Sequence, residues 1–102
     1  MEKKHFLYKM YPPRSSFHLD QDEDEKKAMQ QHMDYWKELT NKKNAIIYGP
    51  VFDPNGVYGM AVIEVNNEEQ AEDIAKGDPA VLSKICTCEL IPMQVGMIRN
   101  MN

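Results

Sequence analysis

The alternation of apolar and polar residues divides the first part of the chain into a strand and a long helix. Alternation from His5 to Tyr11 predicts a strand, and Pro12-Pro13 ends it because proline has no N–H to donate to a strand ladder. A polar loop is expected next. A helix is then predicted from Glu23 to Lys42, because Asp22 can serve as its N-cap and Glu25 completes a capping box.

One face of this predicted helix carries apolar side chains at the spacing of successive turns: Ala28, Met29, Tyr35, Trp36 and Leu39. His32 falls on the same face, four residues after Ala28 and four before Trp36. Two interpretations of this histidine are open. It is either a core residue whose ring bonds to a backbone carbonyl, or a general acid–base group, the commonest catalytic use of an imidazole.

The rest of the chain predicts a hairpin, a second helix and a last strand. The hairpin strands are expected over Ala45–Phe52 and Val57–Val65, joined by the turn Asp53-Pro54-Asn55-Gly56. The second helix is expected to start at a cap on Asn66 or Asn67 and to run through Lys76 to a stop at Gly77. The last elements are a helical turn over Ala80–Lys84 and a long strand over Ile85–Ile98, interrupted or bent at Pro92.

The predicted order is therefore β-α-β-β-α-β within a single domain that spans residues 1–102. This order favours an α+β, ferredoxin-like fold with a four-stranded antiparallel sheet and both helices on one face. Both faces of the predicted last strand carry apolar residues: Leu90, Ile91, Met93, Val95, Met97 and Ile98. One helix layer cannot bury both faces, so a homodimer that covers the open face is expected.

Composition narrows the function classes. A net charge of -4 and a pI near 5.3 argue against a nucleic-acid partner, which requires a clustered basic surface. The short apolar stretches exclude a membrane span, and the start Met1-Glu2-Lys3-Lys4 lacks an apolar signal core, so a cytoplasmic location is expected. Cys86 and Cys88 are expected to be reduced thiols, because C-x-C spacing suits neither a disulfide nor a structural zinc site.

Candidate chemistry centres on His32 and on a carboxylate that could orient it. Asp78 is the candidate partner because it follows the second predicted helix, which lies beside the first in this fold; the alternative is a simple turn residue before Pro79. Arg14 could hold an anionic substrate group or could be a solvated loop residue. Phe17 is an isolated aromatic residue in a polar loop and is expected to pack onto something.

No metal site and no cofactor are predicted. The run Asp20-x-Asp22-x-Asp24 opens like a calcium loop, but its sixth position is Glu25 instead of glycine and its twelfth is Gln31 instead of glutamate. His5 and His18 have no companion at ligand spacing.

Several short motifs together resemble the YCII-related (YciI-like) proteins over nearly the whole chain. They are Pro12-Pro13-Arg14, His32-x-x-Tyr35-Trp36, the segment from Gly49 to Gly59, Asp78-Pro79 and Pro92-Met93. The resemblance implies a ferredoxin-like fold that pairs as a dimeric α/β barrel with a pocket in each subunit. It also implies an active His–Asp pair, which falls on His32 and Asp78 here.

The activity of that family is mostly unassigned, although one branch removes chloride from a chlorinated hydroxyquinol. The wider superfamily includes proteins similar to muconolactone isomerase. The resemblance therefore implies an acid–base enzyme that eliminates or isomerises a small aromatic or lactone-like substrate. His32 would be the base, Asp78 its orienting partner and Arg14 an anion clamp, with Trp36 and Phe17 binding the substrate. The alternative is a non-catalytic dimeric module that binds a small ligand or a partner. An open pocket at His32 lined by Trp36, Arg14 and Asp78 favours chemistry, and sealed packing favours the module.

Overall fold

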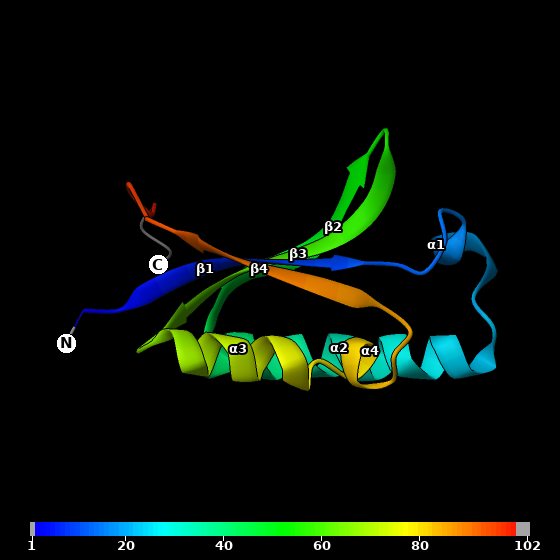
Figure 1. The fold of residues 1–102 in the computed structure, drawn as a ribbon, viewed down its shortest axis with the longest axis horizontal. Helices are drawn as coiled ribbons and strands as arrows, with labels where there is room; N and C mark the ends of the chain where they lie inside the picture. The colour runs from blue at the N-terminus through cyan, green and yellow to red at the C-terminus, as the bar shows by residue number, and fades with distance from the viewer. Residues whose placement is uncertain (1, 100–102) are drawn as a thin grey trace.

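The computed structural model describes residues 2–99 and is built on a four-stranded antiparallel sheet in the order β2-β3-β1-β4 (Figure 1). Its elements are β1 (Lys4–Tyr11), α1 (Phe17–Asp20), α2 (Glu23–Asn41), β2 (Ala45–Asp53), β3 (Gly56–Val65), α3 (Glu68–Gly77), α4 (Pro79–Leu82) and β4 (Thr87–Met93). The predicted β-α-β-β-α-β order and the ferredoxin-like α+β class are confirmed, with one short helix, α1, added and the predicted helical turn after the second long helix present as α4.

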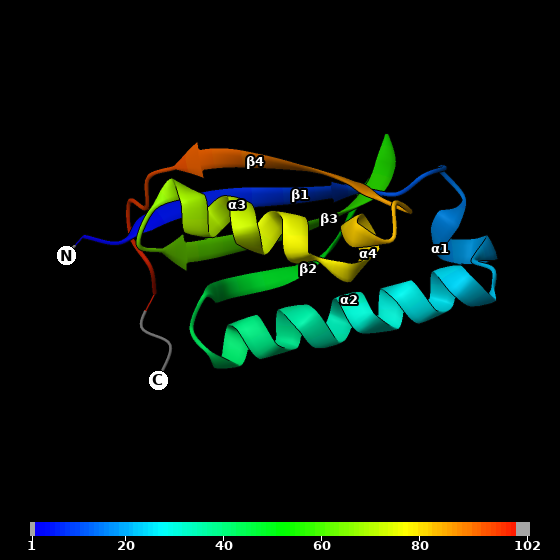
Figure 2. The same cartoon turned by 60° about the horizontal axis from the view of Figure 1, so that its bottom comes forward.

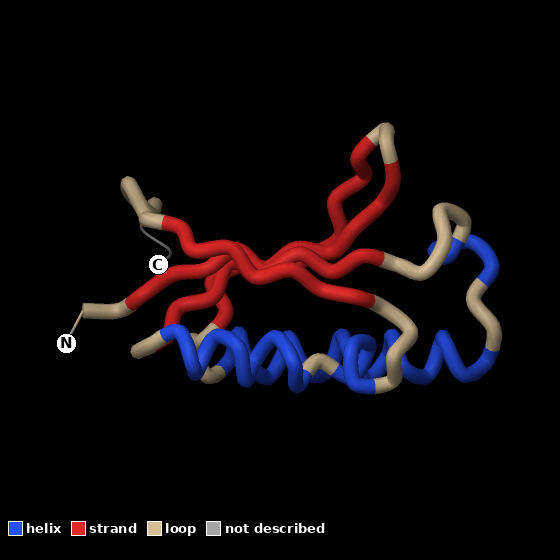
Figure 3. Tube along the Cα trace, in the orientation of Figure 1, coloured by secondary structure: helices blue, strands red, loops and turns tan. Residues whose placement is uncertain are grey.

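The helices form a layer on one face of the sheet. α2 and α3 lie side by side beneath it, with α4 at the end of α3 (Figures 1 and 2). No helix of the described chain covers the opposite face, which is called the open face below. The β2–β3 hairpin bends away from the helix layer toward that side (Figure 3).

The core lies between β1, β3 and the two long helices. Alternate residues of β1 turn toward the helices, so Phe6, Tyr8 and Met10 are buried. Phe6 and Tyr8 pair with Ile63 and Ala61 of β3, which are buried on the same side. The helices complete this core with Trp36 from α2 and Ala71, Ile74 and Ala75 from α3.

The helix starts follow the predicted capping chemistry. The Asp22 carboxylate accepts from Glu25 N at 2.8 Å, and the Glu25 carboxylate accepts from Asp22 N at 2.9 Å, which completes the predicted capping box. Asn67 caps α3 by accepting from Gln70 N at 2.8 Å. The capping pattern therefore located the start of α2, and the structure selects Asn67 from the two caps, Asn66 and Asn67, that the sequence left open for α3.

Three of the predicted elements need correction. The last strand runs from Thr87 to Met93 instead of from Ile85 to Ile98, so the predicted strand residues Ile85, Cys86, Val95, Met97 and Ile98 lie outside it. The reason is that β4 is an edge strand whose one neighbour, β1, begins at Lys4, so little of β1 remains for pairing beyond His5 and Met93. The segment after β1 is not loop throughout but contains α1, and the helical turn predicted over Ala80–Lys84 is α4, Pro79–Leu82.

Both edges of the sheet contain a proline. Pro50 lies in β2 and Pro92 lies in β4, and the pairing of β2 with β3 is irregular between Ala45 and Ile47. Proline cannot donate to a ladder, so it is accommodated at sheet edges.

A close contact joins the end of α3 to α2. The Tyr35 hydroxyl donates to the Ile74 carbonyl at 2.7 Å, and it stands where a side chain on Gly77 would be. A Cβ built on Gly77 would lie 2.7 Å from the Tyr35 oxygen but 3.5 Å from the ring carbon that carries it. Glycine at position 77 thus lets the end of α3 approach α2, and Asp78 follows immediately.

This contact predicts that the effect of Gly77→Ala on the free energy of unfolding depends on whether residue 35 is tyrosine or phenylalanine. Gly77→Ala alone should destabilise the protein by about 1–3 kcal/mol, because the Tyr35 hydroxyl must move and lose its acceptor. In a Tyr35→Phe background the obstacle is gone, so the same substitution should be neutral or stabilise by up to about 1 kcal/mol. Urea unfolding of the four proteins measures the cycle, and equal effects of Gly77→Ala in both backgrounds would contradict it.

Candidate functional site

Asp78 is the centre of the site, at the junction of α3 and α4. It closes α3 and caps α4, where its carboxylate accepts from Ala80 N at 2.9 Å. Its exposure is 0%, and among the described residues it is the charged side chain that lies in the buried core. A carboxylate so far from water needs hydrogen-bond donors around it.

Four groups donate to this carboxylate, and they come from different parts of the fold. Besides Ala80 N, they are the Tyr8 hydroxyl of β1 at 2.7 Å, Trp36 Nε1 of α2 at 2.9 Å, and His32 Nδ1 of α2 at 2.8 and 2.9 Å from the two oxygens. Within residues 2–99, no buried side-chain nitrogen or oxygen lacks a partner. The buried polar cluster is fully satisfied.

Opposing effects set the pKa of the Asp78 carboxyl. Burial raises this pKa, but the hydrogen bond and charge of His32, together with the bonds from Trp36 and Tyr8, outweigh burial and hold it below its usual range. Burial and the neighbouring Asp78 charge raise the pKa of Tyr8, so its hydroxyl remains a donor. The ionised Asp78 stabilises the fold above the pKa it has in the unfolded chain, and this contribution is lost as pH falls through its lower folded pKa.

The carboxylate also determines which ring nitrogen of His32 is free. An ionised carboxylate only accepts, so Nδ1 carries the proton that is shared with Asp78. In the neutral ring, Nε2 then holds the lone pair. Nε2 has no partner among the described residues and is not a buried unsatisfied atom, so it is open to its surroundings; the side chain is 14% exposed.

His32 lines a cavity of about 310 Å³ beside the core. Its walls come from α2, from the ends of β1 and β3, from β2 and from the α1 segment. Aromatic and other apolar side chains make up most of the lining, including Tyr8, Trp36 and Phe17. No lysine, arginine, aspartate or glutamate of the described chain lines it.

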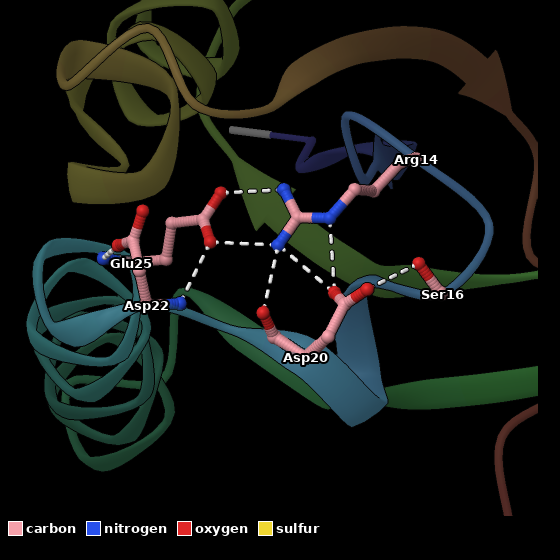
Figure 4. A network of polar contacts seen from close by, with 5 residues as sticks. All are labelled: Arg14, Ser16, Asp20, Asp22 and Glu25. Atoms are coloured by element: carbon pink, nitrogen blue, oxygen red, sulfur yellow. Dashed lines mark hydrogen bonds and ion pairs between the residues drawn. The ribbon is translucent and has the colours of Figure 1, made fainter.

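The structure thus brings four of the five predicted site residues together. His32, Trp36 and Phe17 line the cavity, and Asp78 lies behind His32. Arg14 is not brought to the cavity wall. Its guanidinium binds the carboxylates of Glu25 and Asp20, as Figure 4 shows.

Sequence reasoning missed the hydroxyl of Tyr8 as part of the site. The alternation in β1 placed Tyr8 on the side that Trp36 also faces, and the two rings lie 4.9 Å apart between centroids. That pattern indicates burial but not a bond to a carboxylate 70 residues away. It also missed the contribution of β2 and β3, where Tyr48 and Tyr58 line the cavity.

Residues 2–99 contain neither a cluster of metal ligands nor a helix that could span a membrane. No three histidine, cysteine, aspartate or glutamate side chains there are grouped so that they could hold a metal ion. No helix of that part of the chain has the length and apolar character to cross a membrane.

The hydrogen bonds predict opposite tautomers for two histidines. When neutral, His32 should carry its proton on Nδ1 because that atom donates to Asp78. His5 should carry its proton on Nε2, which lies 3.0 Å from Glu64 Oε2, and so provides an internal control. Long-range ¹H–¹⁵N NMR spectra of the neutral rings distinguish the two forms. A proton on Nε2 of His32 would mean that Asp78 does not orient the ring.

Comparison with known proteins agrees with this architecture. The YCII-related domain model matches residues 5–94, whereas no curated protein matches the chain. Among solved structures, the chain is similar to the uncharacterized protein TM1266 from Thermotoga maritima, with 12% identity and a TM-score of 0.54 over 91% of this chain and 100% of that one. Similarity at this identity shows a shared fold. Since the family match spans most of the chain, the protein belongs to the YCII-related domain family.

Proposed function

We propose that the protein is an acid–base enzyme in which His32 transfers a proton on a small aromatic or lactone-like substrate, by isomerisation or elimination. The observation that carries the proposal is the bond from His32 Nδ1 to the buried Asp78 carboxylate, which leaves Nε2 open beside a cavity. An imidazole held in one tautomer by a buried carboxylate is suited to accept a proton and return it.

The proposed step begins when Nε2 removes a proton from a substrate carbon or hydroxyl. The electron pair of the broken bond moves into the substrate, and Asp78 stabilises the imidazolium that forms. In isomerisation, the imidazolium returns the proton at another carbon. In elimination, the leaving group departs with its electron pair as an anion, and His32 then releases the proton to solvent. Both routes leave His32 neutral for the next cycle.

The cavity lining supports a small substrate without a permanent charge. No ammonium or guanidinium of the described chain lines the cavity, and the basic side chains in its lining are the imidazoles of His18 and His32, so no permanent cation there offsets a carboxylate or phosphate on the ligand. The charge of Asp78 lies behind His32 and disfavours a second anion in front of it. The rings of Phe17, Trp36 and Tyr8 provide apolar faces on which a flat molecule can pack.

The test is a panel of small phenols, enols and lactones, including α-angelica lactone, whose double bond moves by proton removal and return. Turnover or deuterium incorporation in D₂O, followed by ¹H NMR, should fall about 10²–10⁴-fold in His32→Gln. Asp78→Asn should also lose rate because the ring is no longer held. Glu38→Gln removes a charge from the exposed surface of α2, the helix that carries His32, and should leave the rate unchanged.

The alternative function, a module that binds a small ligand without transforming it, is favoured by the nearly uniform apolar lining of the cavity. Molecules of the panel that bind in the cavity but show neither exchange nor turnover dependent on His32 would support the module and contradict the enzyme.

We also propose that the protein works as a homodimer through the open face. Leu7, Val62 and Ile91 lie directly opposite one another across β3, β1 and β4 on that face. The pairing of His5 with Glu64 flanks this apolar row, and Ile47 of β2 is 57% exposed. An apolar centre with a polar border is the usual organisation of an interface between two copies.

The dimer proposal predicts that a charge at the centre of this face separates the copies. Val62→Glu should convert the protein to monomers, because a stable interface of about 1,200–2,000 Å² cannot bury two unpaired carboxylates at its centre. Lys37→Glu, on the exposed surface of α2, is the matched control and should remain dimeric. Light scattering over a range of concentrations measures both, and a wild-type monomer at every concentration would refute the dimer.

A further inference from the structure

The segment from Pro12 to Gln21, which contains α1, forms the wall of the cavity that has the fewest contacts with the rest of the fold. It is called the α1 segment below. Pro12, Phe17, His18 and Gln21 contribute this wall, and no other helix or strand of the described chain packs extensively against α1. Phe17 is buried, with 4% exposure, yet it stands outside the main core cluster. Its burial therefore depends on the position of α1 and not on the central packing.

A single arginine ties this segment to α2 (Figure 4). Arg14 Nη1 and Nη2 donate to the two carboxylate oxygens of Glu25 at 2.7 and 2.8 Å, which is a two-pronged pair. Arg14 Nε donates to Asp20 Oδ1 at 2.9 Å, and Nη2 to the Asp20 carbonyl at 3.1 Å. The arginine thus joins the start of α2 to the far end of α1.

Two more contacts hold Asp20 and Arg14 in these positions. Ser16 Oγ donates to Asp20 Oδ2 at 2.6 Å, and the guanidinium carbon of Arg14 lies 5.3 Å from the centre of the Phe17 ring. The hydrogen bond from Arg14 lowers the pKa of Glu25 to about 2, and the bond from Asp22 N adds to this. Glu25 is therefore ionised at neutral pH and serves both the capping box of α2 and the tie to Arg14.

The other walls are held by core packing or by backbone ladders, and the β2–β3 hairpin that provides Tyr48 and Tyr58 is paired from Ile47 to Asp53. β1 and β3 are held by ladders in the sheet, and α2 carries Trp36 into the core. The ties of Arg14, by contrast, lie at the surface, where its side chain is 38% exposed.

The cavity reaches the surface beside the exposed side chains of Met33 and Tyr48. We infer that α1 is the movable wall whose displacement widens this opening for a ligand, and that Arg14 is a positioning residue that holds this wall, with Phe17, in place. The inference goes beyond the acid–base chemistry, because access widened by α1 is the same whether the occupant is transformed or only bound. Arg14 then acts on the cavity from outside it, through Glu25 and Asp20.

The test needs no ligand, because Trp36 is the protein's one tryptophan, lines the cavity and is 1% exposed. Acrylamide quenching of its fluorescence reports entry of a small neutral molecule. Arg14→Gln should raise the quenching rate constant about two- to fivefold, as expected for the loss of partly exposed ion pairs. Arg14→Lys should give a quenching rate constant between those of the wild type and Arg14→Gln, because lysine keeps the positive charge but cannot make the two parallel hydrogen bonds of a guanidinium.

Three comparisons complete the experiment. Lys26→Gln removes a cation from the same turn of α2, where Lys26 pairs with Glu23 at 3.7 Å, and should change nothing. Phe17→Ala removes the side chain that closes the wall and should give the largest quenching. Hydrogen exchange of the Leu19 and Asp20 amides, which donate to Ser16 O, should accelerate in Arg14→Gln, while the Ile63 amide in β3 stays protected.

Each outcome decides the inference. Faster quenching and faster α1 exchange in Arg14→Gln, with Ile63 unchanged, would support it. Unchanged quenching in Arg14→Gln beside a large rise in Phe17→Ala would show that Arg14 does not hold the wall. No rise in Phe17→Ala would show that displacement of α1 does not widen the opening. Accelerated exchange at Ile63 as well would make Arg14 a contributor to global stability only, which also overturns the inference.

Discussion

A carboxylate that water does not reach joins the main parts of this fold. Asp78 accepts hydrogen bonds from the sheet, through Tyr8, and from α2, through His32 and Trp36, and it also caps α4. Removing one partner of a buried pair of this kind commonly costs about 3–5 kcal/mol, because the remaining charge is left without compensation. Because Gly77 has no side chain, the end of α3 packs closely against Tyr35 of α2. This close packing places Asp78 within hydrogen-bond distance of His32 and Trp36. The site and the packing of the helices on the sheet are therefore one structure.

The walls of the cavity are of two kinds, one held by core packing and one held by polar contacts. The wall formed by α2 and β1 belongs to the core, and it presents His32 with one nitrogen fixed and the other free. The wall formed by α1 is held mainly by polar contacts at the surface. Chemistry that depends on a fixed proton acceptor can thus coexist with a way in for a ligand, since the two requirements fall on different segments.

The local features of this fold were accessible from the sequence, and the long-range ones were accessible only in part. Helical spacing placed His32 beside Trp36, and the chain order placed Asp78 near both, because two crossover helices of this fold must be neighbours. The convergence of Tyr8 and Trp36 on the same carboxylate depends on the register of β1 against the helices, which no local pattern specifies. The end of β4 depends on how far β1 extends, which is a property of the partner strand. For Arg14, the sequence showed a cation near several acidic residues, but the choice between them and a ligand depends on the path of the chain through α1.

The sheet has two free edges, and both are poor templates for another strand. Pro50 removes a backbone donor from β2, the bulge beside Ala45 distorts its ladder, and Pro92 removes a donor from β4. An incoming chain would find an interrupted row of partners on either side, so open-ended growth by strand addition is disfavoured. Placing these interruptions at the edges protects a small, partly apolar sheet from fibrous aggregation while leaving its central strands continuous.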